Sequence, residues 1–422
     1  MRSVDDQLER VLATAVQPEP VRIAISEALG LICAEEVAAT KALPGFPQAA
    51  VDGYAVRAVD VGGQRGLRDT QGTRPGEPAP VAAVKSLPVV GEVNAGSTKP
   101  LRLQPKQAVR VTTGAPLPTL ADAVLPLAWS DRGTRRVVPK QPVYSGDFVR
   151  REGDDIRPGD IAVYPGAVLG PAHIGLLAAV GRSKVLVYPR PRLSIISVGH
   201  ELVDIDREPG LGQVYDVNSY ALAAAARDAG AEVHRVGIAA GEPRRLREIV
   251  EGQLIRSEIV VISGAVGGAG SEMIQRVLGE YGSFDTTRVA MHPGSVQGFG
   301  IIGDKPCFLF TNNPVAALVD FEVFVRPLIR RIVGKSGRRF VKARALNRLE
   351  SRPGRRGFIR AQLMRDSETS EYLVEGLSGS SGAPAHLLAG MGEANAMIRI
   401  PEEVESVRPG DVVDVLFLSQ RG

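Results

Sequence analysis

The sequence is poor in several residue types, and each shortage excludes a class of protein. Its two cysteines, Cys33 and Cys307, are too few and too isolated for a disulfide framework or a metal site, and their apolar surroundings predict burial. The five histidines show no pairing at ligand spacing, so we expect no structural zinc. The longest apolar run, near residues 174–180, is far too short to span a bilayer, and the first residues lack the apolar core of a signal peptide. These features predict a cytoplasmic protein with no membrane span.

A strong charge of either sign is also missing. The chain has 51 basic and 47 acidic residues, and no basic stripe interleaved with aromatic residues, so we expect no nucleic-acid partner. With 44% hydrophobic residues in a chain of 422, there is enough apolar material for several cores and two to four domains. The 47 glycines and 30 prolines predict many turns and short strands.

Between residues 193 and 334, short apolar runs alternate with amphipathic segments. Strands are predicted at 193–197, 233–238, 259–262 and 307–310, separated by helices at 218–229, 244–254, 273–281 and 315–333. This alternation is typical of a parallel sheet covered by helices on both faces, a doubly wound α/β domain. The segments 44–136 and 335–422 differ, because they contain only short strands and turns.

The most informative stretch lies inside the α/β region. There the strand 259–262 runs into Ser-Gly-Ala-Val-Gly-Gly-Ala-Gly at 263–270 and a predicted helix from Ser271, followed by His-Pro-Gly at 292–294 and Asn-Asn-Pro at 312–314. A glycine-rich turn between strand and helix lets backbone amides approach an anion such as a phosphate group. Such turns are also glycine-rich for backbone reasons alone, so the loop by itself does not decide between the two explanations.

The order of the motifs along the chain is more specific than any one of them. They are Val-Asp-Gly-Tyr-Ala at 51–55, Thr-Gly-Ala-Pro at 113–116, Gly-Asp-Asp-Ile at 153–156, Ser-Val-Gly-His-Glu-Leu at 197–202, Asp-Val-Asn-Ser at 216–219 and the loops just described. Together they resemble the MoeA and gephyrin E-domain family of molybdopterin molybdenumtransferases over essentially the whole chain. The resemblance implies a MoeA-like α/β multidomain fold and the insertion of molybdate into adenylylated molybdopterin, in a cleft between the subunits of an elongated homodimer.

The resemblance also implies how the chain divides into domains. Residues 1–19 and 181–334 are expected to form the doubly wound molybdopterin-binding domain, and residues 20–43 and 137–180 an elongated connecting domain. Residues 44–136 are expected to form an inserted β-rich domain, and residues 335–422 a C-terminal β-barrel with a Gly/Ser loop at 378–385. The N-terminal helix, predicted at 4–16, is expected to pack back on the doubly wound domain.

A set of site residues follows from the resemblance. The implied catalytic residues are Asp52, Thr113, Asp155, Glu201 and Glu272. The implied cofactor-binding residues are Ser263, Gly264, Gly267, Gly268, Arg288, His292 and Asn313. Mg²⁺ is the implied cofactor, with Asp52 and Glu201 as ligands, because carboxylate oxygens suit a hard divalent cation. Asp and Thr beside glycine also commonly bond their own backbone, so a structural role for each is the alternative.

Several ligand-facing positions depart from the family pattern. Three positions that the family fills with lysine hold Arg288, His292 and Ser295, of which only Arg288 keeps a permanent cation. Glu272 stands for an aspartate, and the aspartate expected at Gly241 is displaced or lost. Ala385 also stands where a serine is usual. These changes put catalytic competence in question, and the alternative is that they are tolerated variants of a working enzyme.

The departures raise a second reading, a gephyrin-like dimeric scaffold with a vestigial active site. Gephyrin's E domain binds receptor peptides in an apolar pocket whose matching positions are Leu8, Phe358 and Pro401, and all three are apolar here. An actinobacterial gephyrin-like branch of the family docks the C-terminal tail of the division protein FtsZ, which makes that tail the candidate peptide partner. Ordinary core packing is the alternative for these three residues.

Overall fold

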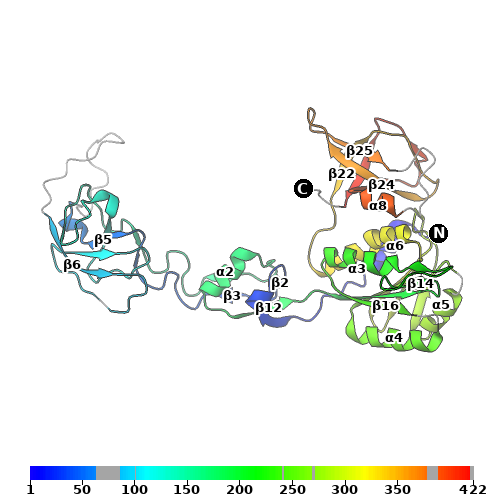
Figure 1. Cartoon of the computed structure of the whole chain (residues 1–422), viewed down its shortest axis with the longest axis horizontal. Coiled ribbons are helices and arrows are strands. Elements are labelled where there is room, and N and C mark those ends of the chain that lie inside the picture. Colours follow the sequence, from blue (N-terminus) through cyan, green and yellow to red (C-terminus); the bar gives the residue numbers. More distant parts are fainter. Residues whose placement is uncertain (63–85, 100, 240–241, 269–270, 378–387, 419–422) are drawn as a thin grey trace. The chain divides into compact units, whose positions relative to one another are not determined.

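The computed structural model describes residues 1–62, 86–99, 101–239, 242–268, 271–377 and 388–418. The chain divides into two compact units, Met1–Val21 with Tyr188–Gly422, and Arg22–Val187 (Figure 1). Each unit has hydrophobic cores of its own. The finer division into four domains stays a prediction.

The first unit contains a mostly parallel sheet with the strand order β16-β13-β17-β21-β20-β18. Its strands are β13 (Arg192–Val198), β16 (Glu232–Ala239), β17 (Ile259–Ser263), β18 (Gly282–Asp285), β20 (Gly298–Ile302) and β21 (Lys305–Phe310). The central strands β13, β17 and β21 run parallel, whereas β18 and β20 form an antiparallel edge. All five residues of β17 are buried, as expected of a strand covered on both faces.

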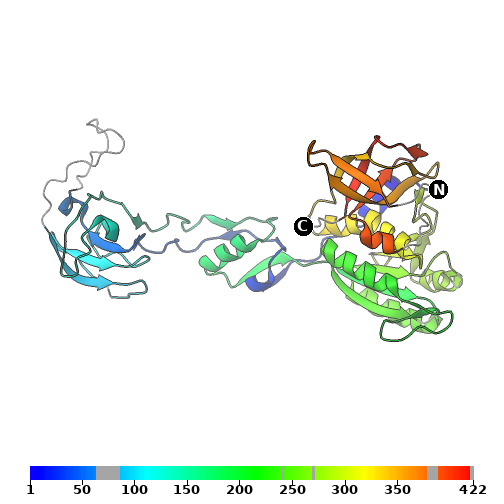
Figure 2. The ribbon, with the colours of Figure 1, turned by 45° about the horizontal axis from the view of Figure 1, so that its top comes forward.

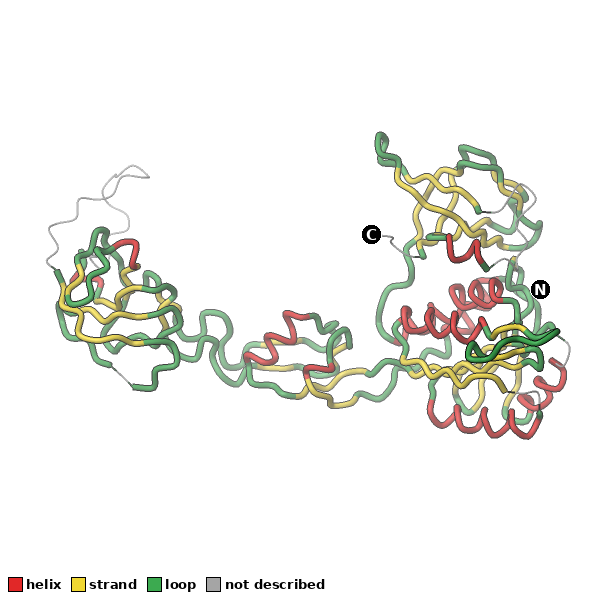
Figure 3. The backbone as a smooth tube through the Cα atoms, viewed as in Figure 1, coloured by secondary structure: helices red, strands yellow, loops and turns green. Residues whose placement is uncertain are grey.

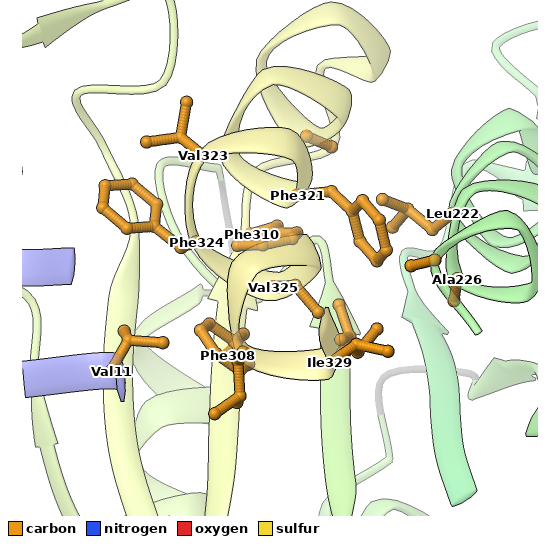
Figure 4. Packing of buried hydrophobic residues seen from close by; sticks show 14 of the residues in the cluster. Val11, Leu222, Ala226, Phe308, Phe310, Phe321, Val323, Phe324, Val325 and Ile329 are labelled. Carbon is orange, nitrogen blue, oxygen red and sulfur yellow. The ribbon is translucent and has the colours of Figure 1, made fainter. Parts of the chain in front are cut away.

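Helices cover both faces of this sheet (Figure 3). On one face lie α3 (Val217–Ala229), α6 (Pro314–Asp320), the π-helical turn η4 (Phe321–Val325) and α7 (Arg326–Ile332). On the other lie α4 (Pro243–Arg256) and α5 (Ser271–Gly279). Figure 4 shows Phe308 and Phe310 of β21 packed with Phe321 and Phe324 of η4. The predicted doubly wound arrangement is therefore confirmed.

Local signals set the helix ends. Asp216 caps α3 by accepting a hydrogen bond from Ser219 N at 3.1 Å, and Gly230 ends the helix at a φ of 111°, where a side chain would be strained. The helix expected over 315–333 consists of α6, the π-helical turn η4 and α7 in succession. A π turn accommodates one extra residue in a helical turn. The N-terminal helix α1 (Val4–Leu12) also ends earlier than the predicted residue 16.

The C-terminal part of the first unit is a closed barrel. Its sheet has the order β24-β25-β22-β28-β26, and a further pairing of β26 with β24 closes the ring. The strands are β22 (Phe340–Ala345), β24 (Arg356–Arg365), β25 (Tyr372–Gly376), β26 (Ala396–Ile400) and β28 (Val412–Phe417). A short strand from the α/β part, β19 (Met291–His292), extends this sheet by pairing with β24. Figure 2 shows the barrel, in orange and red, beside the α/β part.

The barrel and the α/β part share one hydrophobic core. Phe358, Met397 and Leu416 of the barrel belong to the same buried cluster as Phe308 and Phe324. The remaining small elements of this unit are β14 (Leu202–Val203), β15 (Val214–Tyr215), β23 (Leu349–Glu350), β27 (Ser406–Val407) and α8 (Ala389–Glu393).

The second unit is built around a sheet with the order β8-β5-β7-β6-β9. These strands are β5 (Gly53–Val56), β6 (Leu87–Val93), β7 (Ala108–Val111), β8 (Ala123–Pro126) and β9 (Arg136–Val137). Two apolar clusters cover its faces, one around Tyr54 and Leu125 and the other around Val109 and Val124. Short helical turns lie at η2 (Ala58–Asp60) and η3 (Leu127–Trp129).

A third cluster of the second unit packs helix α2 (Pro171–Ala179) against short strands. These are β1 (Val21–Ala24), β2 (Ile32–Cys33), β3 (Val37–Ala38), β11 (Ile161–Val163) and β12 (Lys184–Tyr188), with η1 (Ile25–Glu27) beside them and β4 (Gln48–Ala49) paired with β10 (Val149–Arg150). Both Cys33 and Cys307 are buried, as predicted. Over the described ranges, no helix has the length and apolar character needed to cross a bilayer.

Candidate functional site

The parallel strands of the first unit bring several polar residues to one edge. β17 ends at Ser263 and the neighbouring β21 ends just before Thr311, and parallel neighbours end at the same edge of a sheet. Asn218 of α3 donates from Nδ2 to Ser263 Oγ at 2.7 Å and to the Thr311 carbonyl at 3.2 Å. Three segments far apart in sequence therefore meet at the carboxyl edge of the sheet.

Close packing requires glycine at two positions of the loop after β17. Gly264 has a φ of +84°, and a Cβ there would overlap the carbonyl oxygen of Val198. Gly267 has a φ of +77°, and a Cβ there would lie 3.2 Å from Val296 Cγ1 and 3.4 Å from Thr311 Cγ2. The loop is thus fitted between the end of β13, the 291–298 loop and the turn after β21. In contrast, Gly268 is exposed and a Cβ there would meet nothing within 4 Å.

A buried polar network holds the start of α3 at the same edge. Ser197 Oγ donates to Asp216 Oδ1 at 2.9 Å, and Ser219 Oγ donates to Asp216 Oδ2 at 2.6 Å. Asn218 is 6% exposed, and its Oδ1 is buried without a hydrogen-bond partner in the described structure. Asn218 was not among the predicted site residues, although the Asp-Val-Asn-Ser motif that contains it is a signal in the sequence.

The two asparagines after β21 have different surroundings. Asn312 donates from Nδ2 to Glu201 Oε1 at 3.3 Å, which joins the predicted catalytic glutamate to this edge. Asn313 caps α6, because its Oδ1 accepts from Ala316 N at 3.0 Å, and Pro314 fills the first helical position. The side chain predicted to bind the cofactor therefore serves the start of a helix. Glu272 is exposed in the first turn of α5.

The three positions that replace lysines lie on or beside the 288–295 loop and face different surroundings. Arg288 is exposed, whereas Ser295 is 9% exposed and donates from Oγ to the Val289 carbonyl at 2.9 Å. His292 is half-buried in β19 beside the barrel strand β24. Burial lowers the pKa of His292, and the positive charges of Arg352 and Arg355 lower it further. Of the three, Arg288 alone presents a permanent cation.

In the second unit, Asp52 and Thr113 form a direct pair. Thr113 donates to Asp52 Oδ1 twice, from its backbone N at 2.7 Å and from Oγ1 at 2.8 Å. The antiparallel pairing of Gly53 with Val111 brings the two residues together. These two hydrogen bonds, the backbone one first, hold the pKa of Asp52 below its ordinary value. The lowered pKa keeps the carboxylate ionised at neutral pH, and because Asp52 is exposed the carboxylate is open to a ligand.

Asp155 also belongs to the second unit, in the turn before β11. It is exposed, and its backbone N donates to the Leu43 carbonyl at 3.0 Å. The preceding Gly153 has a φ of +72°, which explains the glycine of the Gly-Asp-Asp-Ile motif. Among the described residues, no three or more His, Cys, Asp or Glu side chains are grouped so that they could hold a metal ion.

The predicted site residues therefore fall into two sets, one in each unit. Ser263, Gly264, Gly267, Glu201 and Asn313 gather at the sheet edge of the first unit. Asp52 and Thr113 pair in the second unit, which also holds Asp155. The altered positions Gly241 and Ala385 lie outside the described residues. The catalytic and metal-binding roles of both sets stay predictions.

The positions predicted as a peptide pocket lie near one another in the first unit. Leu8 packs against the shared core, and Phe358 is 6% exposed within it. Pro401 is exposed and follows Ile400, which pairs with Gly357. Phe358 thus occupies the place of a core residue, whereas Pro401 is accessible.

His292 is expected to titrate below the ordinary histidine pKa of about 6.5. Because the folded-state value is lowered, the unfolded state binds more protons as pH falls from that ordinary value. The stability contributed by the neutral imidazole is therefore present above about pH 6.5 and is lost as pH falls through the folded pKa. An NMR titration of the ring, assigned with His292→Gln, measures the midpoint, and a midpoint at or above the ordinary value contradicts the prediction.

Comparison with known proteins agrees with this architecture. Residues 2–181 match the MoeA N-terminal region (domain I and II), residues 194–331 a probable molybdopterin binding domain, and residues 342–418 the MoeA C-terminal region (domain IV). The fold and the glycine loop at the sheet edge thus define a multidomain protein with a probable molybdopterin-binding domain in the middle of its sequence. The chain belongs to the MoeA family of molybdopterin molybdenumtransferases.

Individual relatives cover the whole chain. The sequence is 57% identical to molybdopterin molybdenumtransferase 1 of Mycobacterium tuberculosis (strain H37Rv), over 100% of both chains. It is 35% identical to molybdopterin molybdenumtransferase 2 of the same strain, over 99% of this chain and 100% of the relative. The crystal structure of a molybdopterin biosynthesis MoeA protein from Pyrococcus horikoshii has a TM-score of 0.76 and 30% identity, covering 99% of each chain.

Proposed function

We propose that the chain is a working molybdopterin molybdenumtransferase, which joins molybdate to the dithiolene of adenylylated molybdopterin and releases AMP. The observation that carries the proposal is the 57% identity, over the full length of both chains, to a protein of that name. Identity at this level over every part of the chain supports a shared activity as well as a shared fold. The two sets of site residues support it from the chemistry.

The sheet edge of the first unit suits the phosphate and pterin end of such a substrate. The tight turn at Gly264 and Gly267 exposes backbone near the start of α5, where an anion is favoured. The unpartnered Oδ1 of Asn218 supplies an acceptor at the same edge. Arg288 supplies the permanent cation, whereas a neutral His292 and a buried Ser295 contribute none. We therefore propose that the chain binds molybdate more weakly than a site with three lysines would.

The Asp52 carboxylate suits the reacting end. Both hydrogen bonds from Thr113 go to Oδ1, so the bonds keep the group ionised and do not use Oδ2. We propose that Asp52 accepts a proton or holds a cation there. The family resemblance implies a homodimer whose site is completed by residues of both subunits, and Asp52 is among the implied site residues.

The predicted carboxylates are of the ligand type that Mg²⁺ prefers, but they are too few to surround the ion. Asp52 and Glu201 offer hard oxygen ligands, but they belong to different units. Because the described residues hold no cluster of three such ligands, the remaining positions around a cation would be filled by water and substrate oxygens. Mg²⁺ bound there would neutralise charge on the phosphate oxygens. Asp52 would orient it, with Thr113 fixing the carboxylate.

The test is a reconstituted reaction. The purified chain is incubated with adenylylated molybdopterin and molybdate, with and without Mg²⁺, and AMP release and bound molybdenum are measured. Equimolar AMP and cofactor formation supports the proposal. Tight binding of adenylylated molybdopterin without turnover would instead support a fold that has kept the ligand site and lost the chemistry.

The scaffold reading remains a second candidate because Pro401 is exposed beside the buried Phe358. Phe358→Ala is expected to lower the free energy of unfolding by about 3–5 kcal/mol, because it leaves a cavity in the shared core. The control is Phe340→Ala, at a barrel residue that is 46% exposed. It is expected to change the free energy of unfolding by about 1 kcal/mol or less. Urea denaturation measures both.

Peptide binding is tested separately at Pro401, because its substitution leaves the core intact. The scaffold reading predicts saturable binding of an FtsZ tail peptide that weakens in Pro401→Ala, measured by fluorescence titration. No saturable binding, together with a positive molybdenum-insertion assay, leaves the enzyme as the supported function.

A further inference from the structure

A polar pocket in the first unit is lined by none of the residues at the sheet edge. It is a cavity of about 480 Å³ lined by Asp228, Arg326, Arg330, Gly337, Arg338, Arg339, Val341, Tyr372 and Phe417. Asp228 comes from the last turn of α3, Arg326 and Arg330 from one face of α7, and Arg338 and Arg339 from the segment before β22. None of these residues belongs to the predicted molybdopterin site.

Two of the four arginines are paired with two carboxylates, the buried Glu322 and the exposed Asp228. Arg326 is 5% exposed and donates from Nε to Glu322 Oε2 at 2.7 Å, and its Nη1 lies 2.9 Å from Asp228 Oδ2. Arg338 donates from Nε to the same Glu322 oxygen at 2.8 Å and pairs with Asp228 at 3.2 Å. These two arginines and two acids form a fixed, neutral floor for the pocket.

The other two arginines carry uncompensated charge. Arg330 donates from Nε to the Ser336 carbonyl at 2.8 Å, and within the described part of the chain no carboxylate lies at ion-pair distance from Arg330 or Arg339. Burial lowers the pKa of Arg330, and the neighbouring charges of Arg326 and Arg338 lower it further, as expected where cations crowd together. The pocket therefore has two guanidinium groups more than its carboxylates neutralise.

The remaining wall is aromatic and apolar. Tyr372 begins β25, Val341 lies near the start of β22 and Phe417 ends β28, and these three strands are neighbours in the barrel. The Tyr372 side chain is 39% exposed. A planar ring can stack on such a surface, and guanidinium groups suit phosphate because of their forked donors.

We propose that this pocket binds a small phosphate monoester that carries a planar ring, such as a nucleoside monophosphate. This site is separate from the sheet edge at which we propose that molybdopterin binds. A phosphate monoester carries about −1.5 to −2 charge at pH 7, which matches the two uncompensated guanidinium groups. The cavity lies in the range of about 300–1,000 Å³ that holds small ligands. An acidic peptide would need a longer groove than this cavity provides.

The test places a reporter in the pocket. Trp129 is the chain's one tryptophan and belongs to the other unit, so Tyr372→Trp puts a new indole at the proposed ring contact. AMP is expected to change its fluorescence saturably at low salt, with adenosine having no effect at the same concentration and inorganic phosphate binding more weakly than AMP. Adding Arg330→Ala and Arg339→Ala to the reporter chain should weaken AMP binding by about a hundredfold, about tenfold for each charged contact.

The control variant is Arg331→Ala, which removes an exposed arginine beside Arg330 that does not line the pocket. It should leave AMP binding unchanged. The substitutions at 330 and 339 leave the ion pairs of the buried Glu322 and of Asp228 in place, so circular dichroism should show folded protein in every variant. The proposal is overturned by no response to AMP, by an equal response to adenosine, by equal binding in the double variant, or by a response to polyglutamate and not to AMP.

Discussion

Replacing Asp52 with Asn is expected to slow molybdenum insertion by at least about a hundredfold, the usual contribution of a positioned acid or base. The amide keeps the shape of the side chain and can still accept a hydrogen bond from Thr113, but it has no charge to hold a cation or take a proton. The rate is measured as AMP released per chain with saturating substrate. Thr113→Val, which removes one of the two donors to Asp52, should have a smaller effect in the same direction.

Asp131 provides a matched control for Asp52 in the same unit. Its Oδ1 accepts from Gly133 N at 3.1 Å and Val138 N at 2.9 Å, and these hydrogen bonds also lower its pKa. Asp131→Asn therefore alters another exposed, hydrogen-bonded aspartate, outside the predicted site, and insertion should continue at the original rate. A normal rate in Asp52→Asn would assign Asp52 to holding the turn at 113–116.

Gly264→Ala is expected to open the glycine loop, with a local cost of at least about 3 kcal/mol from the strained φ and the overlap with Val198 O. Since about 1.4 kcal/mol corresponds to tenfold, amide exchange over 259–268 should accelerate by about a hundredfold. Hydrogen-exchange mass spectrometry of peptides from this segment measures the effect. Binding of adenylylated molybdopterin should fall with it.

Gly268 is the matched control because it lies in the same loop, is exposed and has open space where a Cβ would stand. Gly268→Ala should leave amide exchange over 259–268 close to that of the original chain. If both substitutions had the same effect, the loop would be sensitive to any side chain, and the close approach of Gly264 to Val198 would not be its cause.

The sequence predicted the sheet and the glycine loop because each depends on local patterns. Four apolar runs with helices between them define the parallel sheet, and a glycine between a strand and a helix is required by a positive φ. Asp52 and Thr113 were predicted from two separate motifs, and the pairing of β5 with β7 joins them.

Asn313 shows a local signal that was interpreted differently, because an asparagine directly before Pro314 is typical of a helix cap. Other features could not be predicted, since they depend on how the chain packs. Nothing local distinguishes a Ser295 that faces a ligand from one that bonds the Val289 carbonyl. The arginine pocket depends on the approach of α3, α7 and the barrel, so Asp228 and Arg338 meet although they are far apart in sequence.

The α/β part and the barrel share one core, although the family models treat them as two separate segments of sequence. The matching family models end at residue 331 and resume at 342, as though two modules were joined there. The buried cluster of Phe308 and Phe324 nevertheless contains Phe358, Met397 and Leu416, and β19 is hydrogen-bonded to β24. Truncation at that junction would expose this apolar surface and leave the backbone of β19 unpaired. A chimera of two relatives therefore keeps this core intact only when the α/β part and the barrel are taken from the same relative.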